Sequence, residues 1–160
     1  MHKFLPLRLM SIFLILVLFN SCSGNDSGSF NFVSFELDGV LWESGDASIT
    51  ATQSSNTFIL TLVAFNSNGE RVQLEILEFN APRIGTFVIA PASQHNVLYS
   101  SSGQLDQNTL NALSCPNVEG DITITNIDDI SFSGTFQANV CGVAGQRIIR
   151  NGIFNNVLIQ

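Results

Sequence analysis

Hydrophobic and polar positions alternate over most of the chain after residue 30, and this period of two is typical of β-strands with one buried face. The alternation is clearest over residues 130–140, where the even-numbered positions hold apolar or small residues and the odd-numbered positions hold polar residues. Near the start, Val33, Phe35 and Leu37 alternate with polar residues in the same way. We therefore predict strands over both segments, each with its apolar face toward a core.

Turn signals separate the predicted strands. Asp38-Gly39 predicts a two-residue type I′ turn, so that residues 40–42 return beside the first strand as a hairpin. Asn66-Ser67-Asn68-Gly69 joins strands predicted over 57–65 and 71–76. Because residues 57–65 are apolar on nearly both faces, we expect a central strand covered on two sides.

The remaining segments have weaker patterns. Residues 101–119 have no clear period and predict a long loop, in which Asp106 could cap one turn of helix. Asn151-Gly152 predicts either a tight turn or a bulge between the last two strands, and Pro91 is expected at an edge or in a link. A weaker strand is predicted at 47–53, short strands at 86–90 and 96–100, and further strands at 122–124, 147–150 and 153–159.

These elements predict an all-β fold, an antiparallel β-sandwich or flattened barrel of about eight to ten strands. The tight turns between consecutive strands favour a meander, which either architecture satisfies. No lysine follows the first strand to protect the sheet edges. We expect those edges either to be covered by other segments or to be used for association.

The N-terminal 21 residues form a different kind of segment. Lys3 and Arg8 precede an apolar stretch over 9–19, and Ser21 stands just before Cys22. This order is typical of a secretory signal peptide, and the apolar stretch is shorter than the roughly 20 residues of a membrane-spanning helix. We predict that residues 1–21 are removed.

Leu18-Phe19-Asn20-Ser21-Cys22 resembles the lipobox of bacterial lipoproteins. The resemblance implies that Cys22 is the lipid attachment site, and two or more acyl chains hold a protein stably on a membrane. Residues 22–29 then form the lipidated cysteine with a flexible polar tether, and residues 30–160 form a single all-β domain. The alternative is an ordinary secretory signal that leaves a cysteine nearby.

The acidic composition excludes one class of partner. Without residues 1–21 the chain keeps four arginines and no lysine against thirteen acidic residues, a formal net charge of −9. Nucleic-acid binding requires a basic surface that displaces counterions. We predict no nucleic-acid partner.

Cys115 and Cys141 remain once Cys22 is assigned to lipid. An even pair in an exported chain, with a spacing that fits neither a zinc site nor a redox Cys-x-x-Cys motif, predicts a disulfide. Two buried free thiols are the alternative.

No catalytic signature is found, and we expect no cofactor and no metal. His95 is the only histidine after the signal and lacks a nucleophile motif, so we expect a surface or edge position. Trp42 and Tyr99 are the only large aromatic residues with a polar group, a type used to stack on sugars or anchor partners. Trp42, His95 and Tyr99 are therefore the candidate binding residues, with core or rim packing as the alternative for Trp42. Asp128-Asp129 is expected to be a solvated turn.

Four short motifs resemble an uncharacterised family of small Bacteroidetes-type outer-membrane lipoproteins. They are Phe35-Glu36-Leu37-Asp38-Gly39 with Trp42, Gly85-Thr86-Phe87, Ser133-Gly134-Thr135-Phe136 and Asn151-Gly152-Ile153-Phe154. The resemblance implies an all-β domain anchored to the outer membrane, on its periplasmic or cell-surface face. It supplies no catalytic residue.

Three functional hypotheses follow. The first is a non-catalytic binding or assembly module for a glycan or an envelope protein, using the long loop or an open sheet edge. The second is a structural or stress-related envelope lipoprotein without a small ligand. The third is a hydrolase that uses carboxylates.

Overall fold

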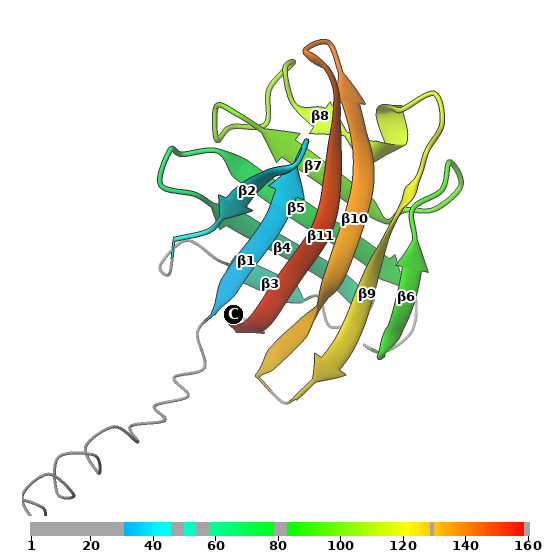
Figure 1. Cartoon of the computed structure of the whole chain (residues 1–160). Helices are drawn as coiled ribbons and strands as arrows, with labels where there is room; N and C mark the ends of the chain where they lie inside the picture. Colours follow the sequence, from blue (N-terminus) through cyan, green and yellow to red (C-terminus); the bar gives the residue numbers. More distant parts are fainter. Residues whose placement is uncertain (1–30, 46–49, 54–57, 79–82, 129, 159–160) are drawn as a thin grey trace, which may run out of the picture.

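The structure is a computed structural model that describes residues 31–45, 50–53, 58–78, 83–128 and 130–158. The predicted signal peptide, Cys22 and the tether lie outside the described residues. The described part holds eleven strands and one short 3-10 helix (Figure 1). The elements are β1 (Phe32–Leu37), β2 (Val40–Glu43), β3 (Thr50–Gln53), β4 (Phe58–Phe65), β5 (Arg71–Glu78), β6 (Gly85–Val88), β7 (Asn96–Ser100), β8 (Leu110–Asn111), η1 (Ala112–Ser114), β9 (Gly120–Ile127), β10 (Ser131–Gly142) and β11 (Gly145–Leu158).

All strand pairs are antiparallel, and the sheet order is β2-β1-β11-β10-β8-β7-β5-β4-β3, with β9 and β6 branching from β10. In Figure 1 the front layer consists of β2, β1, β11, β10, β9 and β6, and β7, β5, β4 and β3 lie behind it. β10 connects the layers, because its residues 132–138 pair with β9 whereas Cys141 pairs with Asn111 of β8. The sheet therefore curls into a half-barrel, which confirms the predicted all-β class.

The inward side chains of the two layers form one apolar core. On β10 the expected alternation is confirmed, since Phe132, Gly134, Phe136, Ala138 and Val140 are all buried. The prediction that Ile130 continues this face is wrong. Ile130 precedes the strand and is exposed, because the turn before β10 places it outside the sheet.

Two glycines on neighbouring strands each lie opposite a phenylalanine. Gly134 on β10 pairs with Phe154 on β11, and Phe136 pairs with Gly152. A Cβ atom at Gly134 would lie 2.4 Å from the Phe154 ring, and one at Gly152 would lie 2.7 Å from the Phe136 ring. The rings thus occupy space that any side chain at these glycines would need.

The pair Asn151-Gly152 forms a bulge within β11. Asn151 has a φ of 53°, and the pairing register with β10 shifts between Phe136 and Ala138. β11 continues without a break on both sides of this point. Of the two predicted alternatives, the bulge is the one that the structure contains.

The predicted turn at Asp38-Gly39 is confirmed. Asp38 and Gly39 both have positive φ angles, 51° and 82°, and Leu37 pairs with Val40 across them. These are the features of a type I′ hairpin turn, in which both central residues are left-handed.

Two predictions, one of connectivity and one of coverage, are wrong. β1 pairs with β11, and β6 pairs with β9 rather than with β5, which precedes it in the chain, so the strands do not form a simple meander. β4 buries only one face, since Ile59 on its other face is 39% exposed. Its outward apolar residues match the general preference of strands for branched and aromatic side chains rather than a second covered face.

The predicted long loop contains structure of its own. Leu110–Asn111 forms β8, and the η1 helix follows at Ala112–Ser114. Asn111 caps this helix by accepting a hydrogen bond from the Leu113 amide at 2.8 Å, so the prediction that Asp106 caps it is wrong. Asp106 lies six positions before η1 and instead accepts a bond from the Asn108 amide, which stabilises a separate turn.

Candidate functional site

A cleft of about 430 Å³ lies at the end of the half-barrel where four connections meet. They are the turns between β1 and β2, between β4 and β5, and between β10 and β11, together with the segment between β7 and β8. Trp42 and Tyr99 both line this cleft. The fold thus brings together two of the three residues predicted from the sequence as binding candidates.

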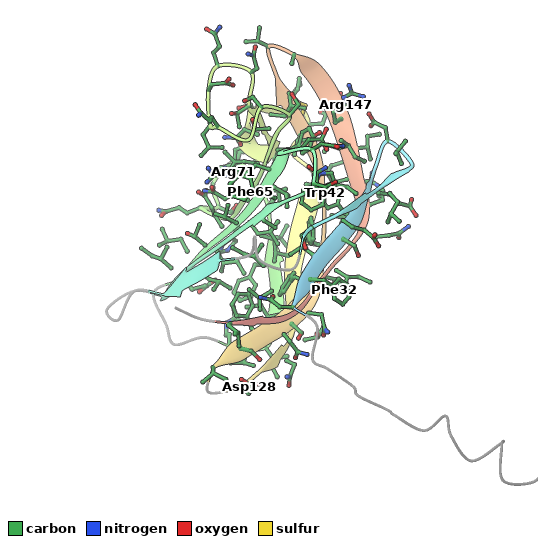
Figure 2. The ribbon with its side chains drawn as sticks, turned by 90° about the vertical axis from the view of Figure 1, so that its left-hand side faces the viewer. Phe32, Trp42, Phe65, Arg71, Asp128 and Arg147 are labelled. Atoms are coloured by element: carbon green, nitrogen blue, oxygen red, sulfur yellow. A yellow bond between two sulfur atoms is a disulfide. The ribbon has the colours of Figure 1, made fainter. Side chains whose placement is uncertain are left out.

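Trp42 packs into the core beneath the cleft. Its ring stacks on Phe35 of β1, with centroids 4.6 Å apart, and the residue is only 4% exposed. Figure 2 shows Trp42 between the layer that carries Phe65 and Arg71 and the layer that carries Arg147. Its indole Nε1 is buried and has no hydrogen-bond partner among the described residues. Trp42 therefore forms a packed floor of the cleft with one unsatisfied N–H donor, and its ring is not open for stacking on a ligand.

Tyr99 contributes a second buried aromatic side chain from β7. It is 6% exposed, and burial together with a hydrogen bond to Glu70 raises the pKa of its hydroxyl group. Glu70 also accepts a hydrogen bond from the Asn66 side-chain amide at 2.6 Å. Tyr99 is accordingly held as a neutral phenol against the turn between β4 and β5.

Asp38 and Arg147 join two of the turns above the cleft. The Arg147 guanidinium donates to Asp38 Oδ2 at 2.7 Å, and the Ile148 amide donates to Asp38 Oδ1 at 2.9 Å. The hydrogen bond from Arg147, followed by that from the Ile148 amide, lowers the pKa of Asp38. The carboxylate is therefore kept ionised and already bonded on both oxygens.

A second hollow of about 370 Å³ continues the cleft along β2. Leu41, Trp42, Asn66 and Asn68 line both hollows, so the two form one groove between β2 and the turn at 66–70. We call this groove, from Asp38 down to Gly45, the β2 groove.

The wall of the β2 groove opposite the strand is a locked turn. Asn66 Oδ1 accepts hydrogen bonds from the amides of Asn68 at 3.0 Å and Glu70 at 2.9 Å. At the lower end of the groove the Gly45 amide donates to the Phe65 carbonyl oxygen at 3.0 Å. This bond joins the segment after β2 to β4 at that end of the groove.

The rim of the groove carries apolar side chains that face solvent. Val40 is 70% exposed and Leu41 is 64% exposed, and both line the cleft. Sequence analysis did not identify these residues as functional. The available signal was the run of three apolar residues at 40–42, because a strand with one buried face cannot bury all three.

His95 lies away from the cleft. Its ring meets the edge of Phe87 with centroids 5.4 Å apart, and its Nε2 lies 3.6 Å from a carboxylate oxygen of Glu78. Burial lowers the pKa of His95, Glu78 opposes that shift, and Arg83 adds to it. Of the two predicted positions, surface or edge, an open surface position does not describe this side chain, which is 12% exposed because Phe87 and the end of β5 lie against the ring.

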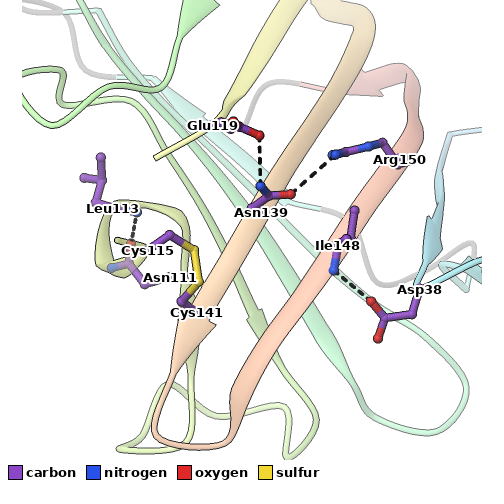
Figure 3. The surroundings of a disulfide bond; sticks show 9 residues. All are labelled: Asp38, Asn111, Leu113, Cys115, Glu119, Asn139, Cys141, Ile148 and Arg150. Atoms are coloured by element: carbon purple, nitrogen blue, oxygen red, sulfur yellow. Dashed lines mark hydrogen bonds between the residues drawn. A yellow bond between two sulfur atoms is a disulfide. The ribbon is translucent and has the colours of Figure 1, made fainter. Parts of the chain in front are cut away.

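Cys115 and Cys141 form a disulfide, as predicted (Figure 3). The bond ties the residue that follows η1 to β10, next to the pairing of Asn111 with Cys141. Two residues before Cys141 on β10, the Asn139 side-chain amide donates a hydrogen bond to the Glu119 carboxylate at 3.1 Å. The disulfide and these polar contacts fix the segment between β7 and β9 that contributes one side of the cleft.

Neither a metal cluster nor a membrane-spanning helix is found in the described ranges. No group of three or more histidine, cysteine, aspartate or glutamate side chains is placed there to hold a metal ion. No helix in the same ranges is long and apolar enough to cross a membrane. Asp128 accepts bonds from the amides of Ile130 and Ser131, the pattern of a self-contained exposed turn.

A family model for a domain of unknown function, DUF6252, matches residues 29–158. The chain belongs to the DUF6252 family. The DUF6252 match includes every described strand, from β1 to β11, and begins after Cys22. No curated protein and no solved structure matches the chain.

Proposed function

We propose that this DUF6252 protein is a lipid-anchored binding module of the outer membrane that engages an envelope protein or a glycan at the cleft. The observation that carries the proposal is the meeting of four connections around one hollow with an exposed apolar rim and a buried aromatic floor. Clefts of about 300–1,000 Å³ with a few convergent polar groups are the usual form of binding sites.

The position of the cleft relative to the chain start supports this proposal. β1 begins at Phe32, three positions after the predicted tether in the sequence, and ends at Leu37, which lines the cleft. A strand of six residues extends by roughly 17–20 Å at about 3.3 Å per residue. A lipid on Cys22 would thus hold the cleft on the side of the domain that faces away from the membrane.

The Asp38 carboxylate does not have the property that a hydrolase needs in its general acid. A glycosidase of the usual kind needs one carboxylic acid with a raised pKa to protonate its leaving group. Asp38 has a lowered pKa because Arg147 and the Ile148 amide bond its carboxylate. The hydrolase hypothesis therefore receives no support from this carboxylate.

Site-specific photo-crosslinking in intact cells tests the proposal. A photoreactive residue in place of Val40 should capture a partner that the same residue in place of Ile153, on the outer face of β11, does not. A glycan array on the same protein tests for a carbohydrate partner. Identical products from both positions, together with no glycan binding, would contradict a binding role for the cleft.

The anchor is tested separately. The full chain should incorporate a clickable fatty acid, and the Cys22→Ser variant should not. Equal labelling of both chains would refute lipid attachment at Cys22 without bearing on the cleft.

A further inference from the structure

The main-chain groups of β2 face two directions, and the structure fixes which residues face which way. The two-residue turn makes Leu37 and Val40 the closing pair of the hairpin. Further along, the Ser44 amide donates to the Val33 carbonyl oxygen at 2.9 Å. In an antiparallel pair such bonded positions alternate, so the main-chain groups of residues 40, 42 and 44 face β1 and those of 41, 43 and 45 face away.

The Gly45 bond confirms this direction. Gly45 donates to Phe65 of the opposite layer, on the side of β2 away from β1. Leu41 and Glu43 point their amide and carbonyl groups to the same side. Within the described ranges, β2 pairs only with β1 and these outward groups of Leu41 and Glu43 have no hydrogen-bond partner. They form an open strand edge along the β2 groove.

An open edge beside a groove accepts an extended peptide better than a sugar. Outward main-chain groups repeat about every 6.8 Å along a strand, the spacing that another strand presents. The aromatic rings that would stack on a sugar are Trp42 and Tyr99, and both are buried as floor. The exposed side chains at the edge are Val40 and Leu41, which suit the alternating side chains of a peptide.

The charges around the groove indicate that the bound peptide is positively charged. Glu43 lies on the edge strand and Glu70 on the opposite wall, whereas the cation at the cleft, Arg147, is already bonded to Asp38. After loss of residues 1–21 the chain has a formal net charge of −9. A second copy of this chain would bring another acidic edge against Glu43, and like charges facing each other across strands are destabilising.

We propose that the free edge of β2 binds an extended, positively charged peptide segment of an envelope partner by strand addition in the β2 groove. The inference rests on the proposed binding function and names the class of partner. Main-chain hydrogen bonds to Leu41 and Glu43 supply affinity, and Glu43 and Glu70 select basic side chains.

The probe is a peptide of three Lys-Val repeats blocked at both ends, titrated into the full chain in detergent micelles. Its matched controls are three Glu-Val repeats and a Lys-Val peptide with N-methyl groups at alternate residues, which removes donors from one edge. We expect saturable binding, with amide hydrogen exchange at Leu41 and Glu43 slowed at least tenfold. Both control peptides should bind at least tenfold more weakly.

Two variants locate the interaction on the chain. Leu41→Pro removes the outward amide without touching the ladder to β1, and should weaken binding at least tenfold. Glu43→Gln keeps the backbone intact and should weaken it several-fold, whereas Asp121→Asn, on the outer face of β9, should not. If Leu41→Pro fails to fold, Glu43→Gln and the N-methylated peptide still decide the question.

The contrary outcomes are distinct. Amides of Leu41 and Glu43 that are already protected without peptide, equal binding of the acidic peptide, or protection elsewhere on the chain would each overturn the inference. A glycan that binds at the cleft with no response to the peptide overturns strand addition and leaves the proposed function standing. Dimers of the chain that dissociate in Leu41→Pro would assign the edge to a second copy and overturn it as well.

Discussion

The guanidinium of Arg147 bonds the carboxylate of Asp38 at 2.7 Å, although the two residues are 109 positions apart in the chain. The contact holds the turn between β10 and β11 against the turn between β1 and β2, because Asp38 also accepts a bond from the Ile148 amide. Both turns border the cleft. The shape of the cleft mouth thus depends on a pair that sequence separation alone would not bring together.

This pair predicts a loss of stability in acid. The pKa of Asp38 lies below its usual value of 3.8, so its stabilising effect is complete above that value and is lost as pH falls through the lower folded value. Urea unfolding between pH 2.5 and pH 5.5 should therefore show less acid dependence in Arg147→Gln than in the wild type. Arg83→Gln, whose guanidinium lies beside Glu78 at 3.8 Å, should keep the wild-type dependence. Equal slopes for wild type and Arg147→Gln would contradict the role of this pair.

His95 predicts a second, separate pH effect. Burial lowers its pKa below the usual value of 6.5, so the unfolded chain binds a proton at a higher pH than the folded protein does. Stability should fall as pH drops below about 6.5, and His95→Gln should remove this part of the dependence. Unfolding free energies at pH 7.5 and pH 5.5 measure it, a window that does not overlap the effect of Asp38. A wild type with equal stability at both pH values would be evidence against it.

The disulfide should contribute strongly to stability. Cys115 and Cys141 are 26 residues apart, and the chain-entropy model gives about 3.5 kcal/mol for closing a loop of that size. The double variant Cys115→Ala with Cys141→Ala should lose about that amount in chemical denaturation. Reduced wild-type protein is the control and should unfold at a similar denaturant concentration. A loss below about 1 kcal/mol in both samples would show that the bond is dispensable.

The glycines opposite phenylalanine rings should not tolerate a methyl group. A Cβ at Gly134 would lie 2.0 Å from the Thr123 carbonyl oxygen as well as against the Phe154 ring. Overpacking of this kind costs about 1–3 kcal/mol and sometimes more, so Gly134→Ala should destabilise by about 3 kcal/mol. Thr135→Ala, on the exposed face of the same strand, should change stability by less than about 1 kcal/mol. Thermal unfolding of both variants distinguishes local crowding from general sensitivity of β10.

Much of the local structure was predictable because its causes are local. The type I′ turn at Asp38-Gly39 follows from two residues that tolerate positive φ, and the inward face of β10 follows from a period of two. The disulfide followed from counting cysteines. The error at Ile130 arose at the end of a strand, because the alternating pattern continues past the point at which the backbone turns. The error at Asp106 arose at the start of a helix, where Asn111 is the capping residue.

The site was only partly predictable. Trp42 and Tyr99 were identified by residue type and do line the cleft, whereas His95 has the same kind of chemistry but lies among Glu78, Arg83 and Phe87. The type of a residue indicates which interactions its side chain can make, but it does not indicate which residues will surround that side chain in the fold. Burial also changed the meaning of the prediction, because the two aromatic rings form a floor beneath the exposed Val40 and Leu41.

By itself, the sequence determined an all-β chain with its hairpin turn, its alternating faces and its cysteine pair, because each depends on residues that are close in the chain or on composition. The tertiary structure alone decided that β1 pairs with β11, that four connections surround one cleft, and that the outward groups of Leu41 and Glu43 remain open among the described residues. These features depend on strand pairings between residues far apart in the chain. Such pairings are selected by the packing of the whole core, and an alternating pattern is compatible with many of them.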